Sequence, residues 1–175
     1  MAHGIALFSG RFDPPNIGHL ITIGWLLKKY SRVIVCVLDY PARKGCNVSV
    51  ACDVFNTVFN LLIQNITCRS RVSVVVNSKH FAYIDLEEIL SICWNATGYK
   101  SIKNVTYVGG NKDVNKHVKS LGCIEVEELP RVLLESNSMG TYIYPPKDQY
   151  MFESTRIRKK IDDGESLGEQ YNIKV

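Results

Sequence analysis

Residues 5–20 have the sequence IALFSGRFDPPNIGHL, and this stretch decides the fold. The first four residues, 5–8, form a short apolar run that stops at Ser9 and Gly10, as a buried strand does where it enters a turn. Apolar residues then recur at helical spacing over residues 20–27. A strand, a loop and a helix are therefore predicted near the start of the chain.

The same alternation continues along the chain. Further strands are predicted at 33–38, 72–76, 105–108 and 123–126, and further helices at 50–64, 85–94 and 113–121. Parallel strands need crossover connections, and right-handed crossovers place helices on both faces of a sheet. The pattern therefore predicts an α/β, Rossmann-like, doubly wound parallel sheet of about five strands. A length of 175 residues favours a single domain over 1–175.

The C-terminal part of the chain is predicted to be less regular. Residues 130–150 are expected to form a loop with one short strand at 141–144, and a long loop in a compact domain is often a lid or a binding loop. Ser154 is a candidate N-cap for a helical segment at about 153–165, which Gly164 would end.

Composition excludes several classes of protein. The hydrophobic share of 46% and the charged share of 22% are those of a globular chain. No apolar run approaches the length of a membrane span, and the N-terminus lacks the pattern of a secretory signal, so a cytoplasmic protein without a membrane partner is expected. The six cysteines contain no C-x-x-C pair, and buried free thiols are favoured over disulfides or a zinc site.

Charge favours a small anionic ligand. The net charge is +4, and its densest cluster, within 156–160, is short. A nucleic-acid surface would usually show a longer basic stripe, so no nucleic-acid partner is expected. Oligomeric state stays open, and a homo-oligomer is compatible with the sequence.

The loop after the first strand has the properties of an anion site. Gly10 permits close backbone approach, Asn16 is placed to cap the following helix, and Gly18 and His19 fall in the first turn of that helix. Free N–H groups and the positive end of the helix dipole converge at such a turn. His19 is expected to donate to phosphate oxygens as charge builds during transfer. The alternative role is a capping or packed histidine.

Two motifs resemble those of the nucleotidyltransferase superfamily. Residues 10–19, GRFDPPNIGH, resemble its G-x-F-D-P-x-H-x-G-H signature, and residues 153–158, ESTRIR, resemble its S-S-T-x-I-R motif. Because both occur in the family's order and on the expected elements, together they are far more specific than either one alone.

The resemblance implies a role for each matching residue. His19 and Asn16 would act with Arg158 at the reacting phosphates, and the remaining nucleotide contacts would come from the two motifs: Ser9, Gly10, Arg11, Phe12, Gly18, Ser154 and Thr155. Ser154 and Thr155 would hold the β- and γ-phosphates together with Arg158. Without the resemblance, Arg158 would be interpreted as a surface partner of Asp162, four residues further along the same helix.

Two positions depart from the family pattern. Asn16 stands where the family has histidine, or threonine in some branches, and it can donate a hydrogen bond but cannot carry a positive charge. Glu153 stands where a serine is usual, and a carboxylate facing phosphates would repel them. These departures keep open a second class of function, a regulatory module that binds a nucleotide without turning it over.

A third segment, Gly109-Gly110-Asn111, follows the predicted strand at 105–108. It resembles the family's Gly-x-Asp turn, which approaches ribose in pyridine-nucleotide adenylyltransferases. Asn111 would take the Asp position, and Asp113 is a shifted candidate. An ordinary turn explains the same residues.

The motif forms are most like those of nicotinamide mononucleotide adenylyltransferases, which join ATP and nicotinamide mononucleotide to give NAD and pyrophosphate. Pantetheine-phosphate adenylyltransferases and cytidylyltransferases share the scaffold and remain alternatives. The implied partners are ATP and a phosphorylated small-molecule acceptor. Mg²⁺ would be held mainly by the ATP phosphates, and no protein metal ligand is assigned.

Overall fold

The structure is a computed structural model, and it describes residues 3–10, 17–38 and 71–130. The chain divides into two compact units. The first consists of Met1–Arg11, Trp25–Tyr40 and Ser70–Arg131, and it holds the sheet described below. The second consists of Phe12–Gly24, Pro41–Arg69 and Val132–Val175, of which residues 17–24 are described. A single domain over 1–175 stays a prediction.

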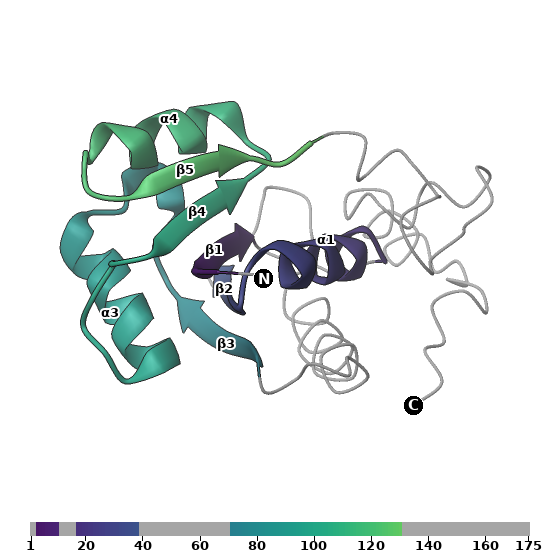
Figure 1. Cartoon of the computed structure of the whole chain (residues 1–175). Helices are drawn as coiled ribbons and strands as arrows, with labels where there is room; N and C mark the ends of the chain where they lie inside the picture. The colour runs from purple at the N-terminus through teal and green to yellow at the C-terminus, as the bar shows by residue number, and fades with distance from the viewer. Residues whose placement is uncertain (1–2, 11–16, 39–70, 131–175) are drawn as a thin grey trace, which may run out of the picture. The chain divides into compact units, whose positions relative to one another are not determined.

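Five parallel strands form one sheet in the order β3-β2-β1-β4-β5 (Figure 1). The strands are β1 Ile5–Gly10, β2 Arg32–Leu38, β3 Val72–Asn77, β4 Val105–Gly109 and β5 Glu125–Glu128. From β1 in the centre, β2 and β3 follow on one side of the sheet, and β4 and β5 follow on the other. This order confirms the predicted doubly wound parallel sheet.

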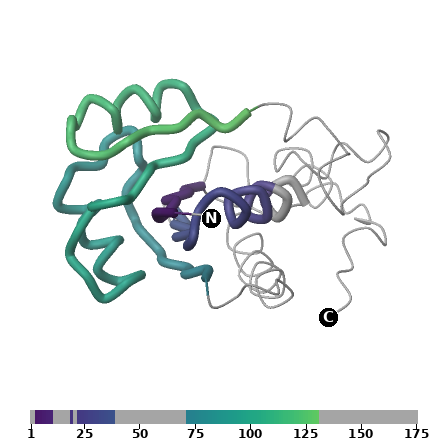
Figure 2. Tube along the Cα trace, viewed as in Figure 1, coloured from purple at the N-terminus to yellow at the C-terminus, as the bar shows by residue number. Residues whose placement is uncertain are grey.

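The helices follow the predicted alternation. α1 spans Ile17–Lys29, α3 spans Leu86–Thr97 and α4 spans Lys112–Ser120, with a 3₁₀ turn, η2, at Phe81–Tyr83. Figure 2 follows the described chain from β3 through η2 and α3 to β4, and then through α4 to β5. The predicted helices at 50–64 and about 153–165, and the strand at 141–144, lie outside the described residues.

Two boundaries depend on capping. Asp85, which was placed inside the predicted helix, is the N-cap of α3, and its carboxylate accepts from the backbone N–H of Glu88 at 2.9 Å. The strand predicted at 123–126 lies two residues further on, at Glu125–Glu128. Gly122, with φ +72°, ends the turn after α4, and the chain uses the next two residues to return to the sheet.

α3 and α4 cover the same face of the sheet and share one core with it (Figure 1). The largest fully buried side chains of this core are Leu7, Ile34, Phe81, Ile84 and Ile89. The odd-numbered residues of β1 and the even-numbered residues of β2 face these helices, because successive side chains of a strand point to opposite faces of the sheet. No helix among the described residues is long and apolar enough to cross a membrane.

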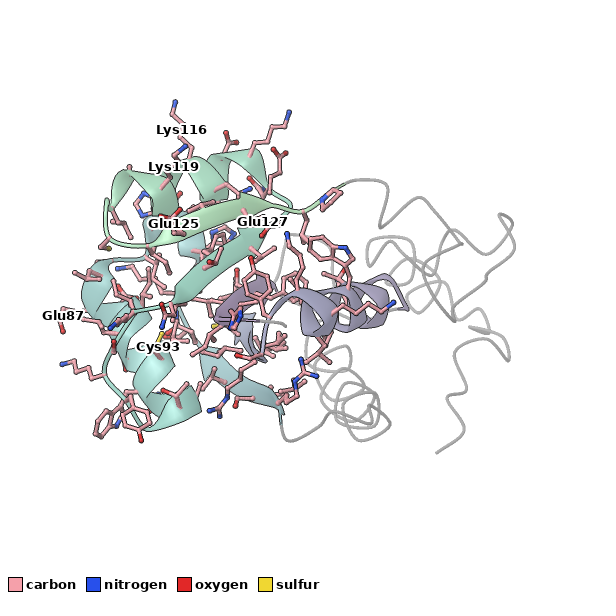
Figure 3. All side chains as sticks on the ribbon, in the orientation of Figure 1. Glu87, Cys93, Lys116, Lys119, Glu125 and Glu127 are labelled. Carbon is pink, nitrogen blue, oxygen red and sulfur yellow. The ribbon has the colours of Figure 1, made fainter. Side chains whose placement is uncertain are left out.

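The core also holds two cysteines. Cys36 in β2 and Cys93 in α3 are buried free thiols, as predicted. Figure 3 labels Cys93. Burial, with a smaller contribution from Cys93, raises the pKa of Cys36 to about 12, and burial raises that of Cys93 to about 11. Both therefore stay protonated and act as small apolar side chains. Cys123 is free and partly exposed.

Arginine side chains cap the C-terminal ends of two helices. Arg71 donates to the carbonyl oxygens of Tyr30 at 2.8 Å and Ser31 at 2.9 Å, and also to that of Leu27 in α1. Arg32 donates to the carbonyl oxygen of Ala96 in α3 at 2.7 Å. Carbonyl groups at helix ends lack intrahelical partners, so both guanidinium groups stabilise these ends.

The end of α1 is also tied to β5. Glu127 of β5 (Figure 3) accepts hydrogen bonds from the ammonium of Lys29 and the hydroxyl of Tyr30. Burial raises the pKa of Glu127, but these two donors outweigh that effect and hold it below its usual value. Burial and the same carboxylate raise the pKa of Tyr30 to about 12. The tyrosine therefore remains a donor at neutral pH.

Candidate functional site

The carboxyl ends of β1 and β4 form the switch point of the sheet. The two strands are neighbours, with Phe8 paired to Val108, and the chain leaves β1 toward β2 but leaves β4 toward β5. Connections that diverge in this way leave a crevice outside the strand ends, where ligands of open α/β sheets bind. The predicted residues Ser9 and Gly10 end β1, and Gly109 ends β4.

A hydrogen bond joins the two strand ends. The hydroxyls of Ser9 and Tyr107 lie 2.9 Å apart, and Tyr107 is buried and stacked on Phe81 with ring centroids 5.3 Å apart. Burial raises the pKa of Tyr107 to about 12, although the bond from Ser9 opposes this. The phenol therefore stays neutral and holds the Ser9 hydroxyl in place.

Gly109 is enclosed by side chains. Its carbonyl oxygen accepts from the Nδ2 of Asn115 and from the backbone N–H of Leu129, both at 2.9 Å. A Cβ added at Gly109 would lie 2.5 Å from the Oδ1 of Asn115 and 2.8 Å from the Cε1 of Tyr107. Because real Cβ atoms do not approach this closely, the position requires glycine.

The next glycine is in a different environment. Gly110 is exposed, and a Cβ added there would meet nothing within 4 Å. The backbone of this turn is therefore open on the side of Gly110 and closed on the side of Gly109.

Asn111 is the N-cap of α4. Its Oδ1 accepts from the backbone N–H of Asp113 at 2.9 Å and from that of Val114 at 3.2 Å. The segment is thus more than an ordinary turn, because it starts a helix at the carboxyl edge of the sheet. Asp113, the shifted candidate, is exposed in the first turn. Contact between Asn111 and ribose stays a prediction.

His19 lies in the first turn of α1, as predicted, because the helix begins at Ile17 and also includes Gly18. The imidazole is partly buried, and this burial lowers its pKa from 6.5 to about 4. The ring is therefore neutral near pH 7. A neutral imidazole still provides one N–H donor.

Several predicted site residues lie outside the described residues: Arg11, Phe12, Asn16, Ser154, Thr155 and Arg158. The meeting of the two motifs therefore stays a prediction. Sequence reasoning also missed two residues of the switch point, Tyr107 and Asn115. A signal for Asn115 exists, because it follows Val114 and lies three residues before Val118 on the buried face of α4. A polar residue on an apolar face suggests a specific partner.

The charges on α4 and β5 are of both signs. Lys116 and Lys119 of α4 point away from the sheet in Figure 3, and Glu125 and Glu127 extend from β5. Within residues 3–10, 17–38 and 71–130, no three His, Cys, Asp or Glu side chains gather in a way that could hold a metal ion.

Comparisons with known proteins give one short sequence match. No protein-family model matches the chain. Over 32 residues the chain is 53% identical to a nicotinamide-nucleotide adenylyltransferase of Sulfurisphaera tokodaii. The match covers 18% of this chain and 19% of that protein.

Solved structures match over nearly the whole chain. A bifunctional NMN adenylyltransferase/ADP ribose pyrophosphatase from Francisella tularensis aligns with a TM-score of 0.64 and 18% identity, over 97% of this chain and 44% of that one. The same protein has been solved in complex with AMP and a Mn ion and aligns with a TM-score of 0.63. NadR protein in complex with NAD and AMP-PNP aligns with a TM-score of 0.57 and 14% identity, over 93% of this chain and 43% of that one.

The chain thus spans less than half the length of these solved proteins. At this level of identity the structural likeness shows the fold. The chain has the nucleotidyltransferase fold, and the resemblance to nicotinamide-nucleotide adenylyltransferases that its motifs indicate is confirmed by a short sequence match to one of them and by the fold of a bifunctional NMN adenylyltransferase/ADP ribose pyrophosphatase.

Proposed function

We propose that this chain is an adenylyltransferase that joins ATP and nicotinamide mononucleotide to give NAD and pyrophosphate. The observation that carries the proposal is the order of elements at the switch point. β1 ends in Ser9 and Gly10, the first motif follows directly, and α1 begins with His19 in its first turn. The sequence match to a nicotinamide-nucleotide adenylyltransferase supports this choice among enzymes of the same fold.

The proposal gives the two substrates different parts of the chain. The ATP α-phosphate and ribose would lie against residues 9–12, and the β- and γ-phosphates would be held by Ser154, Thr155 and Arg158. The turn at Gly109, Gly110 and Asn111, which is open on the side of Gly110, would contact a ribose or the acceptor, nicotinamide mononucleotide. α1 and α4 would then each present an N-terminus to a phosphorylated ligand.

The reaction would be a direct in-line displacement. An oxygen of the acceptor's phosphate forms a bond to the α-phosphorus of ATP, and the bond from that phosphorus to the pyrophosphate oxygen breaks. Pyrophosphate leaves with the electron pair, so no covalent intermediate with the protein is required. Catalysis then consists of positioning and of stabilising the charge that develops on the leaving group.

His19 is suited to stabilising the charge that develops on the leaving pyrophosphate. With a pKa of about 4 its ring is neutral in the ligand-free protein, and its N–H donates to the oxygens that gain charge as pyrophosphate leaves. A neighbouring anion favours the protonated ring, so bound triphosphate raises this pKa and strengthens the hydrogen bond.

Mg²⁺ enters in this proposal together with ATP, as the metal complex of the nucleotide. Mg²⁺ commonly keeps several waters and binds through substrate phosphates, and it would neutralise charge on them. The solved relative with AMP and a Mn ion shows that a protein of this fold is compatible with a divalent ion.

A second candidate function has one observation in its favour. Asn16 and Glu153 replace a family histidine or threonine and a family serine, so a nucleotide-binding module that has lost turnover would show these changes. Pantetheine-phosphate adenylyltransferase and cytidylyltransferase activities are the alternatives on the same scaffold. We also propose a cytoplasmic location, which the buried free thiols Cys36 and Cys93 favour.

One experiment separates these functions. The protein is incubated with Mg²⁺, with ATP or CTP, and with nicotinamide mononucleotide, 4′-phosphopantetheine or a phosphoalcohol, and pyrophosphate release is measured beside nucleotide affinity. The proposal expects release with ATP and nicotinamide mononucleotide. Tight ATP binding without release from any pair would instead identify a binding module, and release with another pair would identify another transferase.

A further inference from the structure

The strands β1 and β4 separate at their carboxyl ends. Their register ends with Phe8 opposite Val108, whereas β1 stays paired with β2 over its whole length. The next opposing pair would be Ser9 and Gly109, and the carbonyl oxygen of Gly109 accepts from the backbone N–H of Leu129, on the other side of β4. Ligands of open α/β sheets bind where neighbouring strands diverge in this way.

The side chain of Tyr107 bridges this opening. Its hydroxyl lies 2.9 Å from the Oγ of Ser9 and 3.0 Å from the point where a Cβ of Gly109 would be. Its ring is stacked on the fully buried Phe81, with an angle of 24° between the ring planes. One side chain, held on the face of the sheet that α3 and α4 cover, therefore contacts the ends of both strands.

The hydroxyl of Tyr107 is not required for packing. The residue is 3% exposed, and a phenylalanine would fill the same space without burying a polar group that needs a partner. Burial raises the pKa of the phenol to about 12, so the hydroxyl keeps its proton at neutral pH. What the oxygen adds is the hydrogen bond to Ser9 across the opening.

Ser9 connects this hydrogen bond to the first motif, which begins at the next residue, Gly10. Ser9 is partly exposed, and Gly10 is the last residue of β1. A Ser9 side chain that is fixed to β4 leaves the end of β1 few orientations. The backbone that leads into the motif is thus held in place before a ligand binds, which lowers the cost of binding.

We propose that Tyr107 is a positioning residue for ATP: its hydroxyl fixes Ser9 where β1 separates from β4, and so holds the start of the first motif in the arrangement that binds the nucleotide. This inference rests on the proposed function, which places the ATP α-phosphate and ribose against residues 9–12. Tyr107 itself touches neither substrate, and its effect is confined to ATP.

The test uses Tyr107→Phe, which removes one oxygen and keeps the stacked ring. We expect the Kd for ATP, measured by calorimetry with Mg²⁺ and without an acceptor, to rise roughly three- to tenfold, as the loss of about one hydrogen bond predicts. The KM for ATP should rise by a similar factor, while the KM for nicotinamide mononucleotide changes less than about twofold. Tyr99→Phe, the same change at a position that is 74% exposed, is the matched control and should alter none of these values.

A second variant shows whether Tyr107 acts through Ser9. Ser9→Ala removes the other hydroxyl and should raise the Kd for ATP at least as much. In the Ser9→Ala background, Tyr107→Phe should then change this Kd less than about twofold, because the bond that it removes is already lost. Ser9→Ala also tests the bond by itself if Tyr107→Phe does not fold, since Ser9 is partly exposed and alanine keeps its Cβ.

The outcomes separate this inference from the proposed function. If wild type binds ATP and the folded variants bind it equally well, or if both KM values rise alike, Tyr107 is a structural residue only. An effect of Tyr107→Phe that is the same with and without the Ser9 hydroxyl would overturn the route through Ser9. A wild type that binds ATP but forms no NAD contradicts the proposed reaction alone, because the Kd measurements need no turnover. A wild type that does not bind ATP would overturn both.

Discussion

At the scale of single residues, the protonation of His19 matters most for the proposed chemistry. The ring is neutral without ligand because its burial in the first turn of α1 penalises the charged form. A charged imidazole would attract phosphate more strongly but would also destabilise the free protein. In the proposed function, His19 would therefore be a donor that becomes charged only when an anion is bound.

This protonation state predicts how stability depends on pH. The folded-state pKa of about 4 lies below the unfolded value of 6.5, so the unfolded chain binds more protons between these pH values. The stability that the neutral His19 ring contributes is therefore present in full above pH 6.5, and it is lost as the pH falls toward 4. Between pH 7.5 and 5 wild type should lose roughly 1–2 kcal/mol more free energy of unfolding than His19→Asn, measured by urea denaturation. Equal losses in the two proteins would show that burial does not depress this pKa.

The two glycines after β4 predict opposite results for the same substitution. Gly110→Ala adds a methyl group to open space and should change the free energy of unfolding by less than about 0.5 kcal/mol. The same methyl should raise the acceptor KM several-fold if the ligand lies against this turn. Gly109→Ala collides with Asn115 and Tyr107 and should cost about 1–3 kcal/mol.

Thermal unfolding and the two KM values of each alanine variant test this pair. A stable Gly110→Ala protein with wild-type kinetics would show that the acceptor does not approach the turn.

At the scale of elements, sequence patterns predicted which segments form strands and helices but not how their ends are held. The N-cap of α4 could be read from Asn111, because asparagine before a helix is a local signal. Arg71 carries no such signal. It caps α1 from 41 residues away in sequence, counted to Tyr30, and only the pairing of β2 with β3 brings it there.

Arg71 therefore gives a prediction for α1. Arg71→Ala leaves the carbonyl oxygens of Leu27, Tyr30 and Ser31 without this donor and should lower the free energy of unfolding by about 1–3 kcal/mol. Lys28→Ala, at an exposed position in the last turn of the same helix, is the control and should cost less than about 0.5 kcal/mol. Chemical denaturation of both variants measures the difference, and similar losses would mean that Arg71 contributes only as a surface charge.

The ends of β5 show the same limit of prediction. Apolar residues just after Gly122 suggested a strand at 123–126, but pairing begins at Glu125, opposite Thr106. Register with β4 decides where the strand starts, and a single segment does not contain that information. The partners of the Glu127 carboxylate, Lys29 and Tyr30, are likewise distant in sequence, and only the fold brings them into contact with it.

At the scale of the whole molecule, alternating strands and helices were enough to predict the doubly wound parallel sheet. Crossover handedness restricts such sheets to few arrangements, and the observed order β3-β2-β1-β4-β5 is one of them. The positions of several candidate residues along the elements were predicted with it: Ser9, Gly10 and Gly109 end their strands, Asn111 caps α4, and His19 lies in the first turn of α1. Their roles toward a ligand stay predictions.

Other features of these strand ends depend on contacts across the sheet. Tyr107 was visible in the sequence only as one member of an apolar strand, and its bond to Ser9 spans 98 positions. Neither motif predicts the contacts of Asn115 and Tyr107 around Gly109, because they arise when a helix packs beside the strand that precedes it.

The central claim is that the chain transfers the adenylyl group of ATP to nicotinamide mononucleotide. The most direct test is NAD formation from ATP, Mg²⁺ and nicotinamide mononucleotide, followed by enzymatic reduction of the product and compared with His19→Ala. We predict steady formation of NAD with one pyrophosphate for each NAD, and a fall in kcat of roughly 10²–10³ in a folded His19→Ala protein. A folded wild-type protein that forms no NAD, but turns over 4′-phosphopantetheine with ATP or a phosphoalcohol with CTP, would contradict the claim.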